Sequence, residues 1–203
     1  MDPISSEVAI VQLSRGPLLG RLQSYSLGAF RYTVLETNQT LYLTGTRRPK
    51  PCTISIPIDQ NSNGEVIRAQ GHPMPWDGMI GYNLNLKDYD LKIPGKSLLA
   101  TIVISKEVLS NLLLKNQNTN LASKRFEVTN QLEFKSDTVE KIRKITDQLV
   151  QTGGKARAPE SGDEILQLVI NEVTATDRET LPIAKRENRH EAAIELLHWC
   201  TKN

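Results

Sequence analysis

The sequence has few of the residues that disulfides, metal sites and aromatic cores require. Its 203 residues include two cysteines, three histidines, two Trp, five Tyr and three Phe. Cys52 and Cys200 lie far apart and do not make a disulfide framework, so we expect each to be a small buried hydrophobe. A catalytic metal needs clustered histidines with a carboxylate, whereas His72, His190 and His198 are scattered. We therefore expect no metal, no other cofactor and ordinary surface histidines.

Long apolar runs and a strong net charge are also missing. No stretch approaches the ~20 apolar residues that a membrane span needs, and the first residues lack the regions of a secretory signal. The formal net charge is +2, with 10 basic and 8 acidic residues in positions 1–104 and 15 of each in positions 105–203. Neither half has the basic excess of a DNA-binding surface. We expect a cytoplasmic protein that avoids the membrane and does not itself bind DNA strongly.

Motifs for nucleophilic catalysis and phosphate binding are absent as well. The sequence has no G-x-S-x-G motif, and neither cysteine has neighbours that would activate a thiolate. Gly153-Gly154-Lys155 lacks the spacing of a phosphate-binding loop, so a flexible connection between helices explains it better. These absences predict that the chain is not an enzyme.

The first half of the chain contains the alternation that is typical of strands. Cys52–Ile58 places its cysteine and its isoleucines on one face. Pro57 cannot donate to a strand ladder, which puts that strand at an edge or near its end. Leu98–Ile104 is continuously apolar, as in a strand buried on both faces. Because turn signals recur about every 8–12 residues, we predict a small antiparallel β-barrel of about eight to ten strands over residues 1–104.

After Ser105 the apolar period changes to that of helices. The predicted segments are a helix from the N-cap Ser105 to about Asn116, a polar stretch Lys115–Ser123, a helix from Ser136 with Val139, Ile142, Ile145 and Leu149 on one stripe, a loop Thr152–Gly162, a helix Asp163–Ala175 and a polar linker Thr176–Ala184. The whole chain is therefore predicted to be α+β, with residues 105–184 as a helical dimerisation segment.

Two features beside the turns of the predicted barrel are candidates for ligand contact. Arg47 and Arg48 follow a strand, where a guanidinium pair would suit a small anion. Trp76 lies in the tight segment Pro73–Gly78, where an indole would line the mouth of a pocket. The alternatives are a solvated turn for the arginines and a tryptophan that packs the end of the barrel.

The predicted helix Asp163–Ala175 is apolar around most of its circumference, which is too wide for packing on one side. Two-fold dimers are the most common soluble oligomers, so pairing of two copies through this helix is one prediction. Burial within a single chain is the alternative. The expected dimer contacts are Ile165, Leu166, Val169, Ile170 and Val173.

The last segment, Arg186–Asn203, has the spacing of an amphipathic helix, with Ala193, Ile194, Leu197 and Cys200 on its apolar stripe. A helix normally buries such a stripe, because ordering the backbone costs about 1–2 kcal/mol per residue. We therefore expect residues 185–203 to be a connector helix that a partner or a neighbouring domain completes.

A set of short segments carries a resemblance to a known family. The segments are Gln12–Leu22, Thr37–Leu41, Gly45–Pro49, Ile93–Gly95 and Glu187–Ala192. Together they resemble the N-terminal sensor region of AraC/XylS-type transcription regulators. The resemblance implies a cupin-like β-barrel that binds a small-molecule effector or reports a protein partner, followed by helices that form a homodimer. In that family the helix similar to Arg189–Cys200 leads into two helix-turn-helix modules, which are absent here, so DNA binding is expected only through such modules.

The resemblance thus implies the ligand-sensing and dimerisation domain of an AraC-like regulator, either as a piece of a longer protein or as a free-standing sensor. An alternative from another class is a metal-free cupin-like enzyme, an isomerase or lyase acting on a small polar metabolite. A structural interaction module, with a barrel filled by side chains and no ligand pocket, is a third possibility.

Overall fold

Two antiparallel sheets and four helices make up the computed structural model, which describes residues 7–46, 51–59, 64–74, 76–81, 83, 85–115, 119–154, 158–175 and 180–182. Sheet A has the strand order β1 (Glu7–Gln12), β4 (Leu41–Thr46), β9 (Asp88–Ile93), β6 (Arg68–Ala69) and β7 (His72–Pro73). Sheet B has the order β12 (Thr180–Pro182), β11 (Thr129–Glu133), β8 (Gly78–Ile80), β5 (Pro51–Asp59), β10 (Ser97–Ser105), β3 (Phe30–Thr37) and β2 (Gly20–Leu27). The helices are α1 (Lys106–Leu114), α2 (Thr119–Val128), α3 (Ser136–Thr152) and α4 (Ala158–Thr174).

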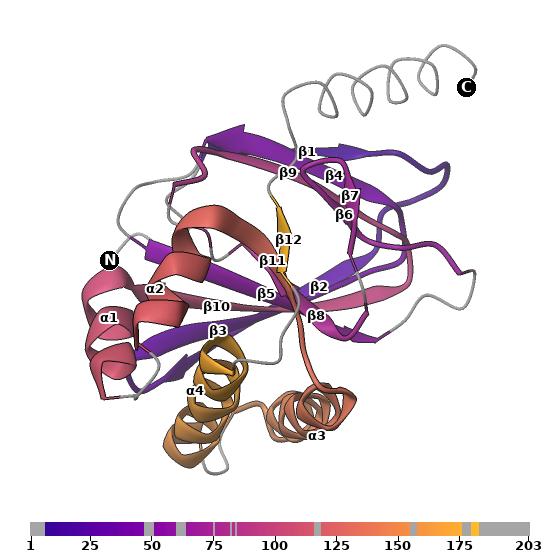
Figure 1. Ribbon diagram of the computed structural model, residues 1–203. Helices are drawn as coiled ribbons and strands as arrows, with labels where there is room; N and C mark the ends of the chain where they lie inside the picture. The colour runs from indigo at the N-terminus through magenta and orange to yellow at the C-terminus, as the bar shows by residue number, and fades with distance from the viewer. Residues whose placement is uncertain are drawn as a thin grey trace.

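The α+β class is confirmed, but the cupin-like closed barrel is not. The described strands fall into two sheets that share no strand. Ten of these strands precede residue 106. The two sheets face each other, and α3 and α4 cover the far side of sheet B (Figure 1). The molecule is therefore layered as sheet A, sheet B and a helix layer, with α1 and α2 beside one end of sheet B.

Each pair of neighbouring layers encloses its own apolar core. Ala100, Ile102 and Ile104 on β10 point toward the helices, while Leu99 points toward sheet A. Because successive side chains on a strand alternate between faces, a continuously apolar strand serves both cores. This arrangement confirms that Leu98–Ile104 forms a central buried strand, since β10 pairs with β3 on one side and with β5 on the other.

The predicted apolar face of Cys52–Ile58 is confirmed. Cys52 is fully buried in the core under the helices, and the three isoleucines are buried with it. Pro57 lies near the end of β5, opposite Leu99, where the register between β5 and β10 shifts. That irregularity accommodates a residue that cannot donate to the ladder.

The first and second predicted helices are confirmed with small changes. Ser105 caps α1, and its side chain accepts a hydrogen bond from the Val108 amide at 3.1 Å. In α3 the predicted stripe is buried. The third predicted helix begins earlier than expected, because α4 starts at Ala158 inside the segment predicted to be a loop.

Three elements of the second half were not predicted. The stretch predicted to be a polar connection contains the first half of α2, and two further strands, β11 and β12, join sheet B. The core under the helices also combines residues from both sides of residue 104. The division into segments 1–104 and 105–184 stays a prediction, as does the connector 185–203, which lies outside the described residues.

One end of the helix layer is held by buried charged groups. Arg125 on α2 is 5% exposed and donates to the carbonyls of Val173 and Ala175 at 2.7 and 2.5 Å, at the C-terminal end of α4. A cation is favourable there because the helix dipole places partial negative charge at that end. Glu172, 4% exposed, accepts from the Thr138 hydroxyl at 2.5 Å and from the Lys135 amide at 3.3 Å, at the start of α3. The end of α4 is thereby tied to α2 and to the start of α3.

Candidate functional site

A groove lies at the other end of the helix layer, where the C-terminal half of α3 passes the ends of β2, β3 and β10. It has a volume of about 560 Å³. A second hollow of about 470 Å³ adjoins it and shares Asp59, Leu98 and Asp147 with it. We call the two together the α3 groove. Its lining residues are Leu19, Gly20, Arg21, Gln23, Val34, Glu36, Thr37, Asn38, Ile58, Asp59, Lys96, Ser97, Leu98, Arg143, Asp147 and Val150.

The turn that carries Lys96 depends on a glycine at position 95. A Cβ atom there would lie 2.8 Å from the Asn38 carbonyl oxygen, so only glycine fits without displacing backbone. Lys96 follows with a φ of 61°, and its amide donates to the Thr37 carbonyl at 2.7 Å. This contact holds the β9–β10 turn against the end of β3 and places Lys96 at the groove.

Asn38 shapes the part of the rim next to this turn. Its side-chain oxygen accepts from the Leu19 amide at 2.7 Å, and its side-chain amide donates to the Pro17 carbonyl at 3.1 Å. These contacts fix the segment that leads into β2. Leu19 itself is 66% exposed, so the rim presents apolar surface to solvent.

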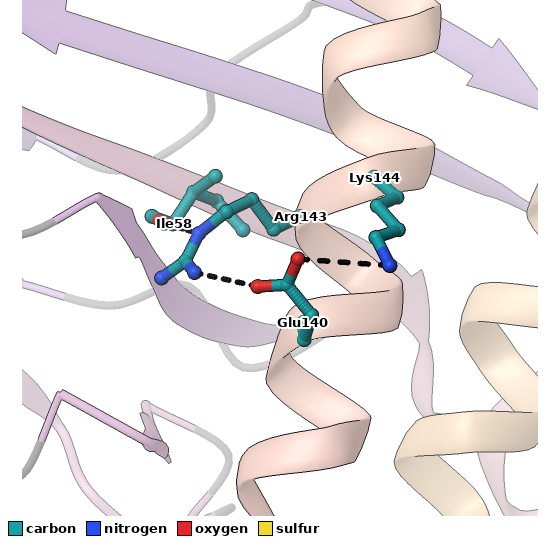
Figure 2. Close-up of polar contacts among 4 residues, drawn as sticks. All are labelled: Ile58, Glu140, Arg143 and Lys144. Atoms are coloured by element: carbon teal, nitrogen blue, oxygen red, sulfur yellow. Dashed lines mark hydrogen bonds and ion pairs between the residues drawn. The ribbon is translucent and has the colours of Figure 1, made fainter.

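Arg143 on α3 joins the groove to the C-terminal end of β5 (Figure 2). Its Nε donates to the Ile58 carbonyl at 2.5 Å, and its guanidinium pairs with Glu140 at 2.7 Å. Glu140 also lies 3.8 Å from the Lys144 ammonium. Arg143 is therefore committed to contacts within the chain and holds α3 to sheet B beside Asp59.

The groove carries charges of both signs. Arg21 on β2 pairs with Glu36 on β3 at 3.2 Å, and both side chains are more than half exposed. Lys96 adds a positive charge near this pair, while Asp59 and Asp147 supply carboxylates where the two hollows meet. The arrangement suits a polar molecule that carries both a cationic and an anionic group.

Tyr25 on β2 and Tyr32 on β3 belong to the core under the helices, and both strands also carry residues that line the groove. Burial raises the pKa of Tyr25, and the charge of Arg21 partly offsets that rise. Burial also raises the pKa of Tyr32, whose hydroxyl forms a 2.6 Å hydrogen bond with Thr146 on α3. Both tyrosines therefore stay neutral at physiological pH, and Tyr32 ties the middle of α3 to sheet B.

A much smaller hollow lies between the two sheets. The hollow between β5, β8 and β9 has a volume of about 30 Å³, which is about enough for one water molecule. On this face of sheet B four hydroxyls form one row across four strands, because Ser24, Thr33, Thr101 and Ser55 are successive register partners. Ser55 and Thr101 are hydrogen-bonded at 2.9 Å, so the row satisfies part of its own bonding capacity.

The predicted ligand-binding residues are only partly placed by the structure. Arg47 and Arg48 lie outside the described residues. Trp76 is partly buried and packs against the core between the sheets. It is not among the residues that line the α3 groove or the small hollow between the sheets. Its role in ligand binding stays a prediction.

The five residues predicted to make dimer contacts are buried within the chain. Ile165, Leu166, Val169, Ile170 and Val173 are 0 to 7% exposed and belong to the core under the helices. Their burial accounts for the wide apolar face of α4, because this helix packs against β2, α2 and α3. A second copy would reach these side chains only if α4 moved. Pairing through them stays a prediction.

Sequence reasoning missed Arg125, Glu172 and the whole α3 groove. A signal for Glu172 was present, because helical spacing places it on the side of Ile165 and Val169. No signal of that kind marks the groove, since its residues come from β2, β3, β5, β10 and α3 and are assembled only by strand pairing.

Two further findings concern the described part of the chain. It contains no group of three or more histidine, cysteine, aspartate and glutamate side chains placed to hold a metal ion. None of its helices is long and apolar enough to cross a lipid bilayer.

Comparison with known proteins gives a likeness in fold. No protein-family model matches the chain, and no curated protein matches it. Among solved structures, it is similar to the crystal structure of the AraC-like transcriptional activator CuxR, with a TM-score of 0.54 and 11% sequence identity. The match covers 93% of this chain and 69% of that chain. At this identity the match shows a shared fold.

Proposed function

We propose that this chain is the ligand-sensing and dimerisation domain of an AraC-like transcription regulator, with its effector bound in the α3 groove. The likeness in fold to an AraC-like transcriptional activator supports the class of protein. The groove supports the sensing role, because its volume of about 560 Å³ is within the ~300–1,000 Å³ of small-molecule sites. This groove is the observation that carries the proposal.

The chemistry of the groove favours a small zwitterionic effector. Asp59 and Asp147 would receive a cationic group where the two hollows meet, and Lys96 would receive an anionic group. Val34, Leu98 and Val150 supply apolar contact between these charges. Because these charged side chains are near solvent, each ion pair adds little affinity by itself, and complementarity at several points has to supply the rest.

An effector in this groove would act on the helix layer. Arg143, Asp147 and Val150 belong to α3, whereas the other lining residues belong to strands of sheet B and to the segments next to them. A ligand shifts an equilibrium only through different affinity for two arrangements. The two arrangements that we propose differ in how closely the C-terminal half of α3 approaches β2 and β10.

Pairing and DNA contact complete the proposal. We propose that two copies associate, as the regulator class implies. The near balance of 25 basic and 23 acidic residues supports assigning DNA contact to helix-turn-helix modules outside this chain. Cytoplasmic location belongs to the same proposal.

Thermal unfolding with a panel of small molecules tests the groove. The panel contains free amino acids, simple amines, simple carboxylic acids and neutral polyols at millimolar concentration. A zwitterion that binds the folded state raises the melting temperature. In the variant Asp147→Asn we expect the ligand to raise the melting temperature by no more than half as much as in the wild type, because the cationic group of the ligand loses a carboxylate partner.

Asp163→Asn is the matched control, since Asp163 is an exposed aspartate on α4 away from the groove. This variant should keep the full rise in melting temperature. A ligand that stabilises the wild type and Asp147→Asn equally would place the binding site elsewhere. If only amines or only acids stabilise the chain, the zwitterion assignment is wrong although the groove is retained.

A further inference from the structure

The outer edge of sheet B is long and regular. β2 contains eight residues and ends that sheet, and its register with β3 runs without interruption from Gly20 to Leu27. Among the described strands, the other free edges are formed by β1 with six residues, β7 with two and β12 with three. Very short edge strands resist pairing with other chains, whereas long regular ones invite it.

Hairpin geometry shows which backbone groups of β2 face outward. Only Gly28 and Ala29 separate β2 from β3, and Gly28 has a φ of 65°, as a two-residue hairpin turn requires. The residues that flank such a turn, Leu27 and Phe30, exchange hydrogen bonds, and this pattern repeats at every second position. The backbone groups of Gly20, Leu22, Ser24 and Ser26 therefore point away from β3. We call these four residues the β2 edge.

The β2 edge lacks the usual protection against pairing. Strand β2 contains no proline and no lysine, and its one charged side chain, Arg21, is neutralised by Glu36 within the chain. Leu22 on the edge is 58% exposed, and Leu18 and Leu19 just before it are 48% and 66% exposed. Natural edges usually carry charges, proline or bulges. Two neutral edges of this kind would not repel each other, and their pairing would cover this apolar surface.

We propose that two copies of the chain pair antiparallel through the β2 edge, about a two-fold axis at Gln23. The inference rests on the proposed function, because it names the surface by which the proposed dimer forms. Each half of such a two-fold interface uses the same residues. The result is one continuous sheet that crosses both copies.

The position of the axis follows from the pleat. A two-fold axis perpendicular to the sheet keeps each side chain on its own face of the sheet. The axis must therefore lie between the two copies of one residue, so that this residue is directly opposite itself. An axis at Gln23 opposes Leu22 to Ser24 and Gly20 to Ser26, and thus uses the whole β2 edge. An axis at Ser24 would leave Gly20 opposite the turn residue Gly28, and an axis at Leu22 would leave Ser26 opposite Leu18, which lies outside β2.

The same strand connects pairing to the groove and to the helix layer. Arg21 and Gln23 line the α3 groove. On the helix side, Gly162 of α4 sits directly on Leu27, because a Cβ atom at position 162 would lie 2.9 Å from the Leu27 Cβ. Pairing through β2 thus places the groove and α4 of each copy beside the two-fold axis.

Cysteine cross-linking tests the register. The change Gln23→Cys is made in a chain with Cys200→Ser, which leaves only the buried Cys52. At the axis, two residues of a non-hydrogen-bonded pair have Cα atoms about 4.5 Å apart, which is within the range of a disulfide. We expect most of the chain to become a disulfide-linked dimer under mild oxidation. Ser26→Cys is the matched control on the same strand, and it should not cross-link because the axis separates its two copies by six residue steps.

Sedimentation over a concentration series tests the edge itself. Ser24→Pro removes an amide that points outward, so the β2–β3 ladder keeps its bonds while the edge loses a donor. Ser24→Lys adds a charge near the axis and covers the case in which the proline variant does not fold. Each change should weaken the wild-type dimer by about tenfold or more. Ser110→Lys, on the exposed face of α1, should leave the dimer unchanged.

The outcomes separate the two proposals. A dimer that persists in both Ser24 variants, or that cross-links through Ser26→Cys and not Gln23→Cys, overturns pairing through the β2 edge while the proposed dimer stands. A wild-type chain that is monomeric at tens of micromolar overturns both the edge and the dimer. The sensing role of the α3 groove is then still decided by its own test.

Discussion

The two ends of the helix layer are held in different ways. At one end, Arg125 and Glu172 are almost fully buried and bond to backbone and hydroxyl groups of α4 and α3. At the other, the charged pairs Arg21–Glu36 and Arg143–Glu140 are between about a third and three-fifths exposed, and they surround a groove. Buried hydrogen-bonded charges are costly to disrupt, whereas exposed pairs contribute little. The buried end therefore fixes the helices relative to one another, and the exposed end is where we propose that a ligand acts.

The largest effect is expected at the buried end, from Arg125→Met. Methionine keeps much of the apolar volume but removes the donors to Val173 and Ala175. Hydrogen bonds to charged groups contribute about 1.5–3 kcal/mol each, so we expect the free energy of unfolding to fall by about 3 kcal/mol. Urea unfolding followed by circular dichroism measures it.

Lys124→Met is the control for that change, because Lys124 is the exposed neighbour of Arg125 on α2. It should alter the free energy of unfolding by no more than about 0.5 kcal/mol. If Arg125→Met lowers the free energy of unfolding no more than Lys124→Met does, the buried end of the helix layer is not held more firmly than the exposed end.

Gly162→Ala is expected to have the next largest effect, where α4 begins to cross β2. The added Cβ would lie 2.9 Å from the Leu27 Cβ and 3.0 Å from the Leu27 carbonyl oxygen. Overpacking of this kind costs about 1–3 kcal/mol, and alanine recovers up to about 1 kcal/mol through its helix propensity. We expect a net loss of about 1–2 kcal/mol in the same unfolding measurement.

A neutral or stabilising effect of Gly162→Ala would show that α4 can lift from β2 at little cost. That result would mean that the loosely held end of the helix layer includes the start of α4 as well as the C-terminal half of α3. Ser161→Ala, at the preceding and less buried position, controls for helix propensity.

Tyr32→Phe tests the attachment of the middle of α3 to sheet B. We expect it to lower the free energy of unfolding by about 1 kcal/mol, the contribution of one hydrogen bond. Burial raises the pKa of Tyr32. The folded state therefore holds the proton more tightly than the unfolded chain, in which tyrosine titrates near pH 10. The stability from this group is complete below about pH 10 and is lost as the pH rises above it.

The measurement is the difference in unfolding free energy between wild type and Tyr32→Phe across that pH range. The difference should shrink as the pH rises above about 10, whereas other tyrosines and lysines contribute equally to both proteins. A difference that stays constant up to pH 11, about one unit above the usual tyrosine pKa, would mean that Tyr32 is reached by solvent.

Local patterns predicted much of the core but little of the groove. The alternation of Cys52–Ile58 and the stripe of α3 identified buried faces, because in both cases periodicity reports which side meets other residues. The sequence of α2 has no comparable stripe, and Arg125 is buried only because the end of α4 supplies carbonyls to receive it. Strand β11 is short and polar, and its pairing with β8 and β12 depends on residues far away in the chain.

The α3 groove could not be predicted for the same reason. Its carboxylates at Asp59 and Asp147 belong to β5 and α3, which are brought together by the packing of α3 on sheet B. The wide apolar face of α4 indicates contact on several sides, and α4 packs against β2, α2 and α3. Periodicity alone does not distinguish contact within the chain from contact with a second copy, and here the chain itself covers those residues.

The smallest effect is expected from Glu36→Gln at the open end. The Arg21–Glu36 pair has an N–O distance of 3.2 Å, and both side chains are more than half exposed. Exposed pairs typically contribute about 0.2–1 kcal/mol, so we expect a loss of at most about 0.5 kcal/mol that disappears in high salt. Glu133→Gln, a change of an exposed glutamate on β11, serves as the control.

A loss above about 1 kcal/mol that persists in high salt would mean that this end is also firmly held, because salt does not screen a desolvated pair. The groove would then be a rigid site, and its effector would have to act through the β2 edge rather than through movement of α3.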